Sequence, residues 1–251
     1  MLVLANAWDA ASARIFERAG FAAIGTTSAG IAFSLGYSDG ERVPRREMMS
    51  AVERIARAVQ IPVTADVEAG YGDAGQTALE VWAAGAVGMN LEDSTSDGLF
   101  DLAPAIRAVR AAVPAMVINA RTDIFWRRMG DEATRFERAV ERLNAYHEAG
   151  ADCLFAPGVQ DGATIARLAE TVRGPLNVLA VAGTPPVAEL KRMGVARVST
   201  GSGPMRATLG LLDRMARQLH KDGAYLAMLN GAMPYAEANG LFADSRESSG
   251  R

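Results

Sequence analysis

Acidic side chains stand at the ends of two apolar segments, where a β-strand would give way to a loop. Asp66 and Glu68 follow the apolar run that begins at Val63, and Glu92 follows the run that begins at Val87. A spacing of two places Asp66 and Glu68 on one strand face. If both runs are parallel strands, the three carboxylates lie at one edge of the sheet and can converge on a hard cation. Mg²⁺ is the predicted ion, with Mn²⁺ as a substitute, because three acids within strand ends are costly without a cation.

Residues that can hold an anion stand at the ends of two further strands. The second strand ends in Thr26-Thr27-Ser28-Ala29-Gly30, and the fifth ends in Asn119-Ala120-Arg121-Thr122-Asp123. A spacing of two places Asn119 and Arg121 on one strand face. A guanidinium opposite a metal is a suitable clamp for an anion, so a small carboxylate is the predicted ligand.

Apolar, β-rich runs alternate with helix-period segments, which predicts eight parallel strands separated by helices. The runs begin near Leu2, Ala22, Val63, Val87, Ala115, Asp152, Leu176 and Val195. Eight strands close a (β/α)8 TIM-type barrel, and the 251 residues match the roughly 250 typical of that fold. An open doubly wound sheet is the rival, but no GxGxxG motif follows the first strand. We expect one α/β barrel domain over 1–243 and a disordered polar tail over 244–251.

The overall composition excludes several classes of partner. The formal net charge is −3, and lysine and arginine form no basic stripe, so nucleic acid is not expected as a partner. Apolar runs fall short of the roughly 18 residues of a membrane helix, so no membrane association is expected. The one cysteine allows no internal disulfide, which favours a cytoplasmic location.

Five short motifs occur in a fixed order at the expected strand ends. They are Asn6-Ala7-Trp8-Asp9, Leu35-Gly36-Tyr37-Ser38-Asp39, Thr64-Ala65-Asp66-Val67-Glu68-Ala69-Gly70-Tyr71-Gly72, Leu91-Glu92-Asp93 and Ala120-Arg121-Thr122. In this order they resemble the isocitrate lyase/phosphoenolpyruvate mutase superfamily, and the chain is similar to a short phosphoenolpyruvate mutase-like member. The resemblance is strongest over residues 6–125. It implies a barrel enzyme that uses Mg²⁺ to stabilise an enolate derived from a small 2-oxo acid.

The resemblance also implies roles for single residues. Asp66 matches the acid that binds Mg²⁺ directly, whereas Glu68 and Glu92 match acids that hold the water ligands of the metal. Asp39 matches an acid near the leaving group. Arg121 matches the arginine that holds the group being transferred or released.

A further set of residues is expected to contact the substrate. Residues 27–29 match the segment that binds a substrate carboxylate or oxo group. Tyr71 is a candidate catalytic residue because it adjoins the acid pair on a glycine-flanked turn, although packing is an equal alternative. The candidate substrate-binding residues are Thr27, Ser28, Ala29, Gly30, Trp8 and Asn119.

The chain departs from the family pattern after the fourth strand. Residues 93–100 contain no cysteine, lysine or histidine, whereas family lyases carry a gating loop whose cysteine handles the proton. Residues 177–183 lack the asparagine-rich carboxylate pocket of those lyases. Isocitrate and methylisocitrate are therefore not the expected substrates. Protonation would fall to Tyr37, Tyr71, Asp39 or solvent.

These observations predict a Mg²⁺-dependent lyase that cleaves or forms a carbon–carbon bond next to a 2-oxo or 2-hydroxy carboxylate. An oxaloacetate decarboxylase-like enzyme or a small dicarboxylate lyase is the preferred form. Two alternatives stay open: P–C bond chemistry of the phosphoenolpyruvate mutase or phosphonopyruvate hydrolase type, and a ligand-binding barrel that has lost turnover.

Several other polar residues have structural interpretations. Cys153 is expected in the core of the sixth strand, and His147 and His220 on helix surfaces. Asp93 and Asp123 could simply cap the helices that follow them. Beyond Gly203 the chain carries more apolar positions than one barrel-closing helix needs. With the resemblance, this predicts a homodimer or homotetramer that exchanges its C-terminal helix.

Overall fold

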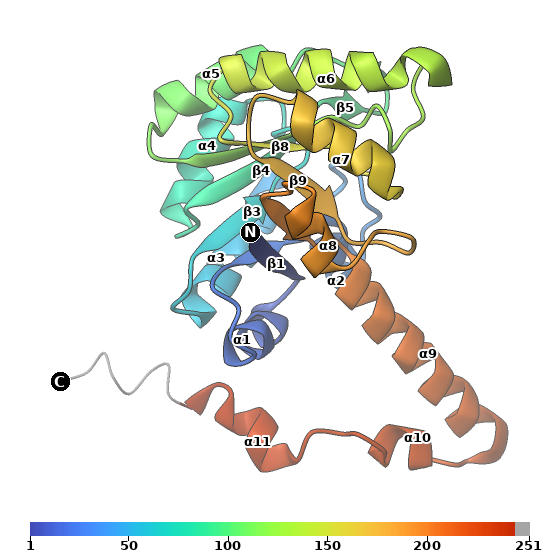
Figure 1. Ribbon diagram of the computed structural model, residues 1–251. Helices are drawn as coiled ribbons and strands as arrows, with labels where there is room; N and C mark the ends of the chain where they lie inside the picture. Colours follow the sequence, from blue (N-terminus) through green and yellow to red (C-terminus); the bar gives the residue numbers. More distant parts are fainter. Residues whose placement is uncertain (244–251) are drawn as a thin grey trace. The chain divides into compact units, whose positions relative to one another are not determined.

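A computed structural model describes residues 1–243 of the chain (Figure 1). The chain divides into two compact units, of which the first is Met1–Ser202 and the second begins at Gly203. The predicted tail, residues 244–251, lies outside the described residues.

Within the first unit, eight parallel strands close into a barrel, as the sequence pattern predicted. The strands are β1 (Leu2–Ala7), β2 (Ile24–Thr26), β3 (Val63–Asp66), β4 (Gly88–Glu92), β7 (Val117–Arg121), β8 (Cys153–Phe155), β9 (Leu176–Leu179) and β10 (Arg197–Ser199). Their order around the barrel is β1-β10-β9-β8-β7-β4-β3-β2. The open doubly wound sheet is thereby excluded.

Eight helices lie between the barrel strands along the described part of this unit and surround the barrel (Figure 1). They are α1 (Ala10–Arg18), α2 (Ser28–Leu35), α3 (Arg45–Ala58), α4 (Ala74–Ala83), α5 (Ala103–Ala112), α6 (Glu132–Glu148), α7 (Gly162–Thr171) and α8 (Val187–Arg192). Their starts follow ordinary capping chemistry. Asp9 caps α1 because its carboxylate accepts the backbone N–H of Ser12 at 2.7 Å, and the Ser12 hydroxyl accepts the N–H of Asp9 at 3.2 Å.

The hydrophobic core lies between the helices and the outward faces of the strands. Met48, Val52 and Ile55 recur at helical spacing on α3, and all three are fully buried. Outward strand residues such as Leu91 and Ile118 belong to the same cluster. The opposite, inner face of the strands carries polar side chains, whereas barrels of this type are usually filled by branched aliphatic residues.

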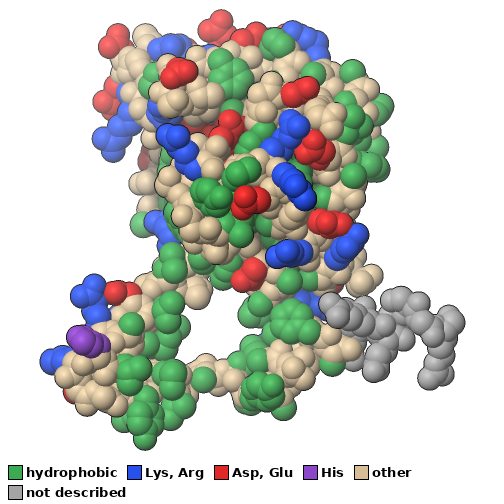
Figure 2. Space-filling view, turned by 180° about the vertical axis from the view of Figure 1, so that it is seen from behind, with side chains coloured by type: hydrophobic (Ala, Val, Ile, Leu, Met, Phe, Trp, Pro, Cys, Tyr) green, Lys and Arg blue, Asp and Glu red, His purple; other side chains and the backbone are tan. Residues whose placement is uncertain are grey.

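The second unit contains α9 (Gly203–Asp222), α10 (Leu226–Leu229) and α11 (Tyr235–Gly240). Its large apolar side chains are mostly exposed, and Figure 2 shows hydrophobic side chains gathered along this segment. The exposed set includes Leu209, Leu211, Leu212, Leu219, Tyr225, Leu226, Met228 and Leu229. The prediction of a single domain over 1–243 stays a prediction for the part beyond Ser202.

Candidate functional site

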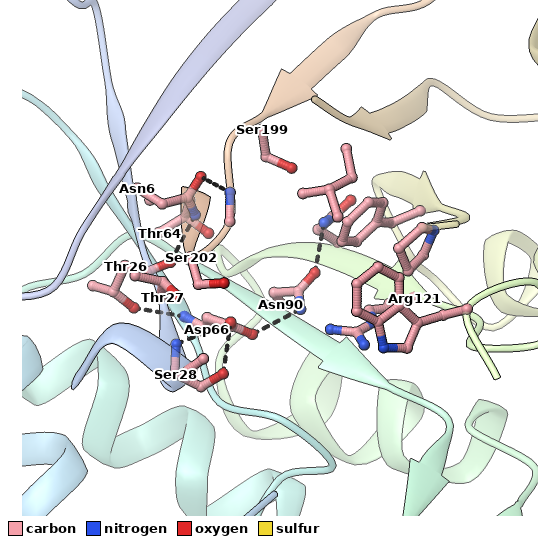
Figure 3. Close-up of a pocket in the computed structure, with 18 of the residues that line it drawn as sticks. Asn6, Thr26, Thr27, Ser28, Thr64, Asp66, Asn90, Arg121, Ser199 and Ser202 are labelled. Atoms are coloured by element: carbon pink, nitrogen blue, oxygen red, sulfur yellow. Dashed lines mark hydrogen bonds between the residues drawn. The ribbon is translucent and has the colours of Figure 1, made fainter. Parts of the chain in front are cut away.

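A cavity of about 110 Å³ opens among the carboxyl ends of the barrel strands. All eight barrel strands contribute to its lining, together with the loops that follow them. Figure 3 shows polar side chains from β1, β2, β3, β4, β7 and β10 pointing into the same space. The position agrees with the general location of active sites in this barrel type.

Asp66, the last residue of β3, is held in a fixed orientation by its neighbours. One carboxylate oxygen, Oδ2, accepts the backbone N–H of Ser28 at 3.1 Å and the Ser28 hydroxyl at 2.9 Å. The other, Oδ1, accepts the side-chain N–H of Asn90 at 2.9 Å. The first turn of α2 therefore faces the Asp66 carboxylate, which is favourable because a helix N-terminus carries partial positive charge.

Two asparagines continue this network across adjacent strands. The Asn119 side chain of β7 donates to Asn90 Oδ1 of β4 at 2.7 Å, and Asn90 in turn donates to Asp66. Asn119 is 1% exposed, and its Oδ1 has no hydrogen-bond partner among the described residues. The cavity lining thus presents a buried acceptor that a ligand hydroxyl or a water could satisfy.

Arg121, at the end of β7, is paired with two carboxylates of the protein itself. Its Nη1 lies 2.7 Å from Glu92 Oε2, and its Nε lies 2.5 Å from Asp123 Oδ1. Burial alone would lower the pKa of Arg121, but these two carboxylates together raise it. Burial raises the pKa of Glu92, and Arg121 opposes that rise. The guanidinium lines the cavity, but its charge is already compensated.

Glu68 does not share the face of Asp66. The strand β3 ends at Asp66, and Glu68 adopts a left-handed backbone conformation with φ of 52°, so the strand alternation expected from the sequence does not extend to it. Its side chain accepts the backbone N–H of Glu41 and lies outside the cavity lining. Burial, followed by the charge of Asp66, raises the pKa of Glu68 to about 7.

Tyr71 lies beside Glu68 rather than in the cavity lining. Its hydroxyl is 3.5 Å from Glu68 Oε1, and its backbone N–H donates to the Glu41 carboxylate at 2.8 Å. Burial and the Glu68 charge raise the pKa of Tyr71. Asp39, by contrast, does line the cavity, and burial together with the Asp66 charge raises its pKa.

No three Asp, Glu, His or Cys side chains within residues 1–243 lie close enough together to form a ready metal-ligand group. The convergence of Asp66, Glu68 and Glu92 expected from their spacing is therefore not seen. Glu68 lies beyond the end of β3 and outside the cavity lining, and Glu92 pairs with Arg121. Asp66 is the one of the three that faces the cavity.

The start of α2 contributes the predicted substrate-binding segment. Thr27, Ser28 and Ala29 line the cavity, whereas Gly30 donates its N–H to the Thr27 hydroxyl at 3.3 Å and lies outside the lining. Ala29 N–H belongs to the first helical turn and has no acceptor among the described residues. It is the open donor of this segment.

Trp126 lines the cavity, whereas Trp8, the tryptophan expected there, does not. Trp8 packs against the hydrophobic core outside the lining, and its backbone N–H donates to Ser12 Oγ at 3.1 Å. Trp126, which the sequence reasoning passed over, lines the cavity instead.

Two further lining residues were missed although strand alternation could have revealed them. Asn6 lies on β1, donates to Thr26 O at 2.7 Å, and would be 2.7 Å from a Cβ at Gly25, so glycine leaves the room it needs. Arg197 lies on β10 and shares the inner face with Ser199.

The segment after Glu92 is a hairpin. Strand β5 (Ser94–Thr95) pairs antiparallel with β6 (Gly98–Leu99). The Ser94 hydroxyl donates to Asp123 Oδ2 at 2.5 Å, which ties the hairpin to the end of β7.

Asp93 and Asp123 do not cap the following helices. The residues at the caps of α5 and α6 are Leu102 and Asp131. Asp93 is fully buried, and its carboxylate accepts from Arg142 Nε at 2.7 Å and from the Tyr146 hydroxyl at 2.8 Å. The capping interpretation is therefore wrong, and Asp93 is part of a buried structural network.

The chain is similar to proteins of one family. The family model described as phosphoenolpyruvate phosphomutase matches residues 1–220. An uncharacterized protein of Mycobacterium tuberculosis is 37% identical over 246 residues, covering 96% of this chain and 92% of that protein. An oxaloacetate decarboxylase of Rhodopseudomonas palustris is 30% identical, covering 90% and 83%. A crystal structure from Burkholderia cenocepacia, provisionally named a phosphonomutase, is 40% identical with a TM-score of 0.82, covering 86% and 93%.

Proposed function

Because the chain belongs to the phosphoenolpyruvate phosphomutase family, we propose that it is a Mg²⁺-dependent lyase acting on a small 2-oxo or 2-hydroxy carboxylate. The bond cleaved or formed is the carbon–carbon bond next to that group, and oxaloacetate-like acids are the preferred substrates. The observation that carries the proposal is the fixed Asp66 carboxylate in a cavity that also holds an open helix N–H and an arginine.

The residues around Asp66 fit a hard cation. The donors are carboxylate and amide oxygens, which Mg²⁺ prefers. Burial, followed by the charge of Asp66, raises the pKa of both Asp39 and Glu68, and a cation beside Asp66 would relieve this repulsion. We propose that Asp66 binds the metal directly and that Glu68 and Glu92 hold its water ligands. Bound Mg²⁺ would supply Lewis-acid stabilisation of the charge that develops on the 2-oxo oxygen.

The protein's own groups bind and orient the substrate. Ala29 N–H is placed to donate to a carboxylate or oxo oxygen. Arg121, braced by Glu92 and Asp123, presents its remaining N–H groups to the departing fragment. Asp39 is the acid nearest the cavity with a raised pKa, so we assign it as the candidate that moves a proton. Tyr71 acts at a distance by fixing Glu68.

The hairpin after Glu92 favours small substrates. It is pinned to β7 and contains none of the cysteine, lysine or histidine side chains that a gating loop would bring. Without such a side chain, the site suits acids that release CO₂ or that take a proton from solvent. The same hairpin supports the second candidate function, a ligand-binding barrel without turnover.

One experiment separates these functions. Oxalate binding is measured by calorimetry with Mg²⁺ and with EDTA, and a substrate panel is assayed for pyruvate, glyoxylate and CO₂. We expect Mg²⁺-dependent oxalate binding, turnover of an oxaloacetate-like acid and none of isocitrate. Undiminished oxalate binding in EDTA would contradict the metal site. Tight oxalate binding with no turnover of any substrate would favour the binding barrel.

The exposed apolar side chains of the second unit support our proposal that the protein is a homodimer or homotetramer that exchanges its C-terminal helix. An amphipathic helix as long as α9 with only Met205 buried leaves its apolar positions in water. Light scattering at micromolar concentration is expected to give a multiple of the 26.5 kDa chain mass. A monomer mass would contradict the proposal.

A further inference from the structure

Arg197 is a buried cation that faces the cavity. It is the first residue of β10 and is 8% exposed. Strand alternation places it with Ser199 on the inner face of the barrel, and both residues line the cavity. Three steps around the barrel, from β10 through β1 and β2, lead to β3 and Asp66.

This guanidinium has no partner among residues 1–243. None of the ion pairs or hydrogen bonds of the described chain includes it, and its buried Nε is unsatisfied. The charge of Asp66 acts on Arg197 through space, but the Asp66 oxygens are held by Ser28 and Asn90 and form no ion pair with it. The nearby Cys153 cannot serve as a counter-ion, because burial raises the pKa of its thiol to about 11 and keeps it uncharged.

Two partly buried arginines of the first unit are paired, in contrast to Arg197. Arg121 is held by Glu92 and Asp123, and Arg142 by Asp93. A buried charge without a partner is costly, so such groups are ordinarily paired. An unpaired arginine that lines a cavity therefore indicates that an anion from outside the protein completes the pair.

The size and polarity of the cavity restrict that anion. A volume of about 110 Å³ is small beside the roughly 300–1,000 Å³ of sites for drug-sized ligands. The lining also holds two buried oxygens without a partner in the described chain, Asn119 Oδ1 and Thr64 Oγ1. A compact acid with a carboxylate at Arg197 and a hydroxyl or hydrated oxo group toward Asn119 would satisfy these groups together.

We propose that Arg197 binds a second carboxylate of the substrate, so that the ligand is a short dicarboxylate that spans the cavity from the Asp66 end to β10. The inference rests on the proposed function, which supplies the other end of the ligand: a 2-oxo or 2-hydroxy acid group bound near Asp66. It assigns the recognition of the second carboxylate to a residue other than Arg121, whose charge the protein already neutralises.

The test compares two ligands that differ only in that carboxylate. Malate carries a carboxylate where lactate carries a hydrogen of its methyl group, and both enantiomers of each are titrated with Mg²⁺ by calorimetry. Product analysis checks that malate stays intact during the titration. We expect wild-type protein to bind one malate enantiomer at least tenfold more tightly than lactate. Equal affinities would overturn the proposal without any mutation.

Substitution of Arg197 then assigns the preference to this residue. Arg197→Gln is expected to weaken malate binding tenfold or more while lactate and oxalate change less than twofold, and Arg197→Lys to give an intermediate loss. Arg167→Gln removes the same charge from an exposed pair with Glu137 and should leave all three affinities unchanged. An equal loss for malate and lactate, or no loss, would show that Arg197 makes a structural contact or binds an ordered water only. If Arg197→Gln does not fold, the lysine variant carries the comparison.

The same measurements distinguish this inference from the proposed function. An Arg197-dependent preference for malate in a protein without turnover would refute the lyase but retain the subsite. Mg²⁺-dependent turnover of oxaloacetate with an unchanged KM in Arg197→Gln would refute the subsite but retain the lyase.

Discussion

Two arginines line the same cavity, and they differ in what surrounds their charge. Arg121 at the end of β7 has Glu92 and Asp123 as partners, whereas Arg197 on β10 has no ionic partner in the described chain. On the β3–β4–β7 side of the cavity, Arg121 is paired and Asp66 and Asn90 are held by hydrogen bonds, whereas the buried oxygens Asn119 Oδ1 and Thr64 Oγ1 have no partner in the described chain. On the β10 side of the cavity, no ion pair of the described chain holds the Arg197 guanidinium. The comparison indicates that the charged groups of the β3–β4–β7 side are oriented before substrate arrives, and we propose that substrate completes the pairing of Arg197.

Loss of Asp66 should have the largest effect, because Asp66 is the carboxylate that we propose binds the metal directly. In Asp66→Ala we expect Mg²⁺-dependent oxalate binding to disappear and turnover to fall about 1,000-fold or more, roughly 4 kcal/mol in the barrier. Calorimetry and steady-state assays measure both, and circular dichroism checks the fold.

Asp97→Ala is the matched control for Asp66. It removes a carboxylate from the exposed turn of the β5–β6 hairpin, outside the cavity lining, and should leave activity within about twofold. Retention of metal-dependent oxalate binding in Asp66→Ala would contradict the assignment of Asp66 as the metal ligand.

Arg121→Lys tests whether the paired arginine serves by geometry or by charge alone. An ammonium cannot reach Glu92 and Asp123 together while keeping N–H groups for a substrate, so we expect kcat/KM to fall about 100-fold, roughly 2.7 kcal/mol. Arg142→Lys is the control, since Arg142 braces Asp93 outside the cavity and should lower the melting temperature with little change in kcat. Full activity in Arg121→Lys would contradict the clamp.

The sequence was sufficient to predict the barrel and to place Asp66 and Arg121 at its cavity. Strand starts such as those of β3 and β9 could be predicted because apolar runs of strand length alternate with helix-period segments. Asn119 and Arg121 could be placed on one face because β7 extends through both. Strand alternation is a good guide wherever the backbone stays extended.

The predictions failed where the backbone is no longer extended, or where the sequence pattern covers only a few residues. Glu68 lies beyond the end of β3 with a positive φ, which the spacing of two could not foresee. The hairpin has strands of two residues each, although Ser96, Asp97 and Gly98 are residues typical of a tight turn. Arg197 was overlooked because an arginine within an apolar run has no motif around it, and its missing partner is visible only in three dimensions.

Substitution of Cys153 should have the smallest effect, and it tests the surroundings of Arg197. It pairs in register with Asn119 at the start of β8 and is buried near Arg197. If its thiol only fills space, Cys153→Ser should cost about 1 kcal/mol in the free energy of unfolding and leave kcat within about twofold.

Burial raises the thiol pKa from 9.0 to about 11, so the native protein at pH 8 holds it protonated. Alkylation by iodoacetamide should therefore be slow at pH 8, accelerate as the pH approaches 11, and be fast at pH 8–9 only after denaturation. Rapid native alkylation at pH 8, or a thousandfold loss of kcat in Cys153→Ser with an unchanged melting temperature, would make Cys153 a reacting group and the charge of Arg197 its counter-ion.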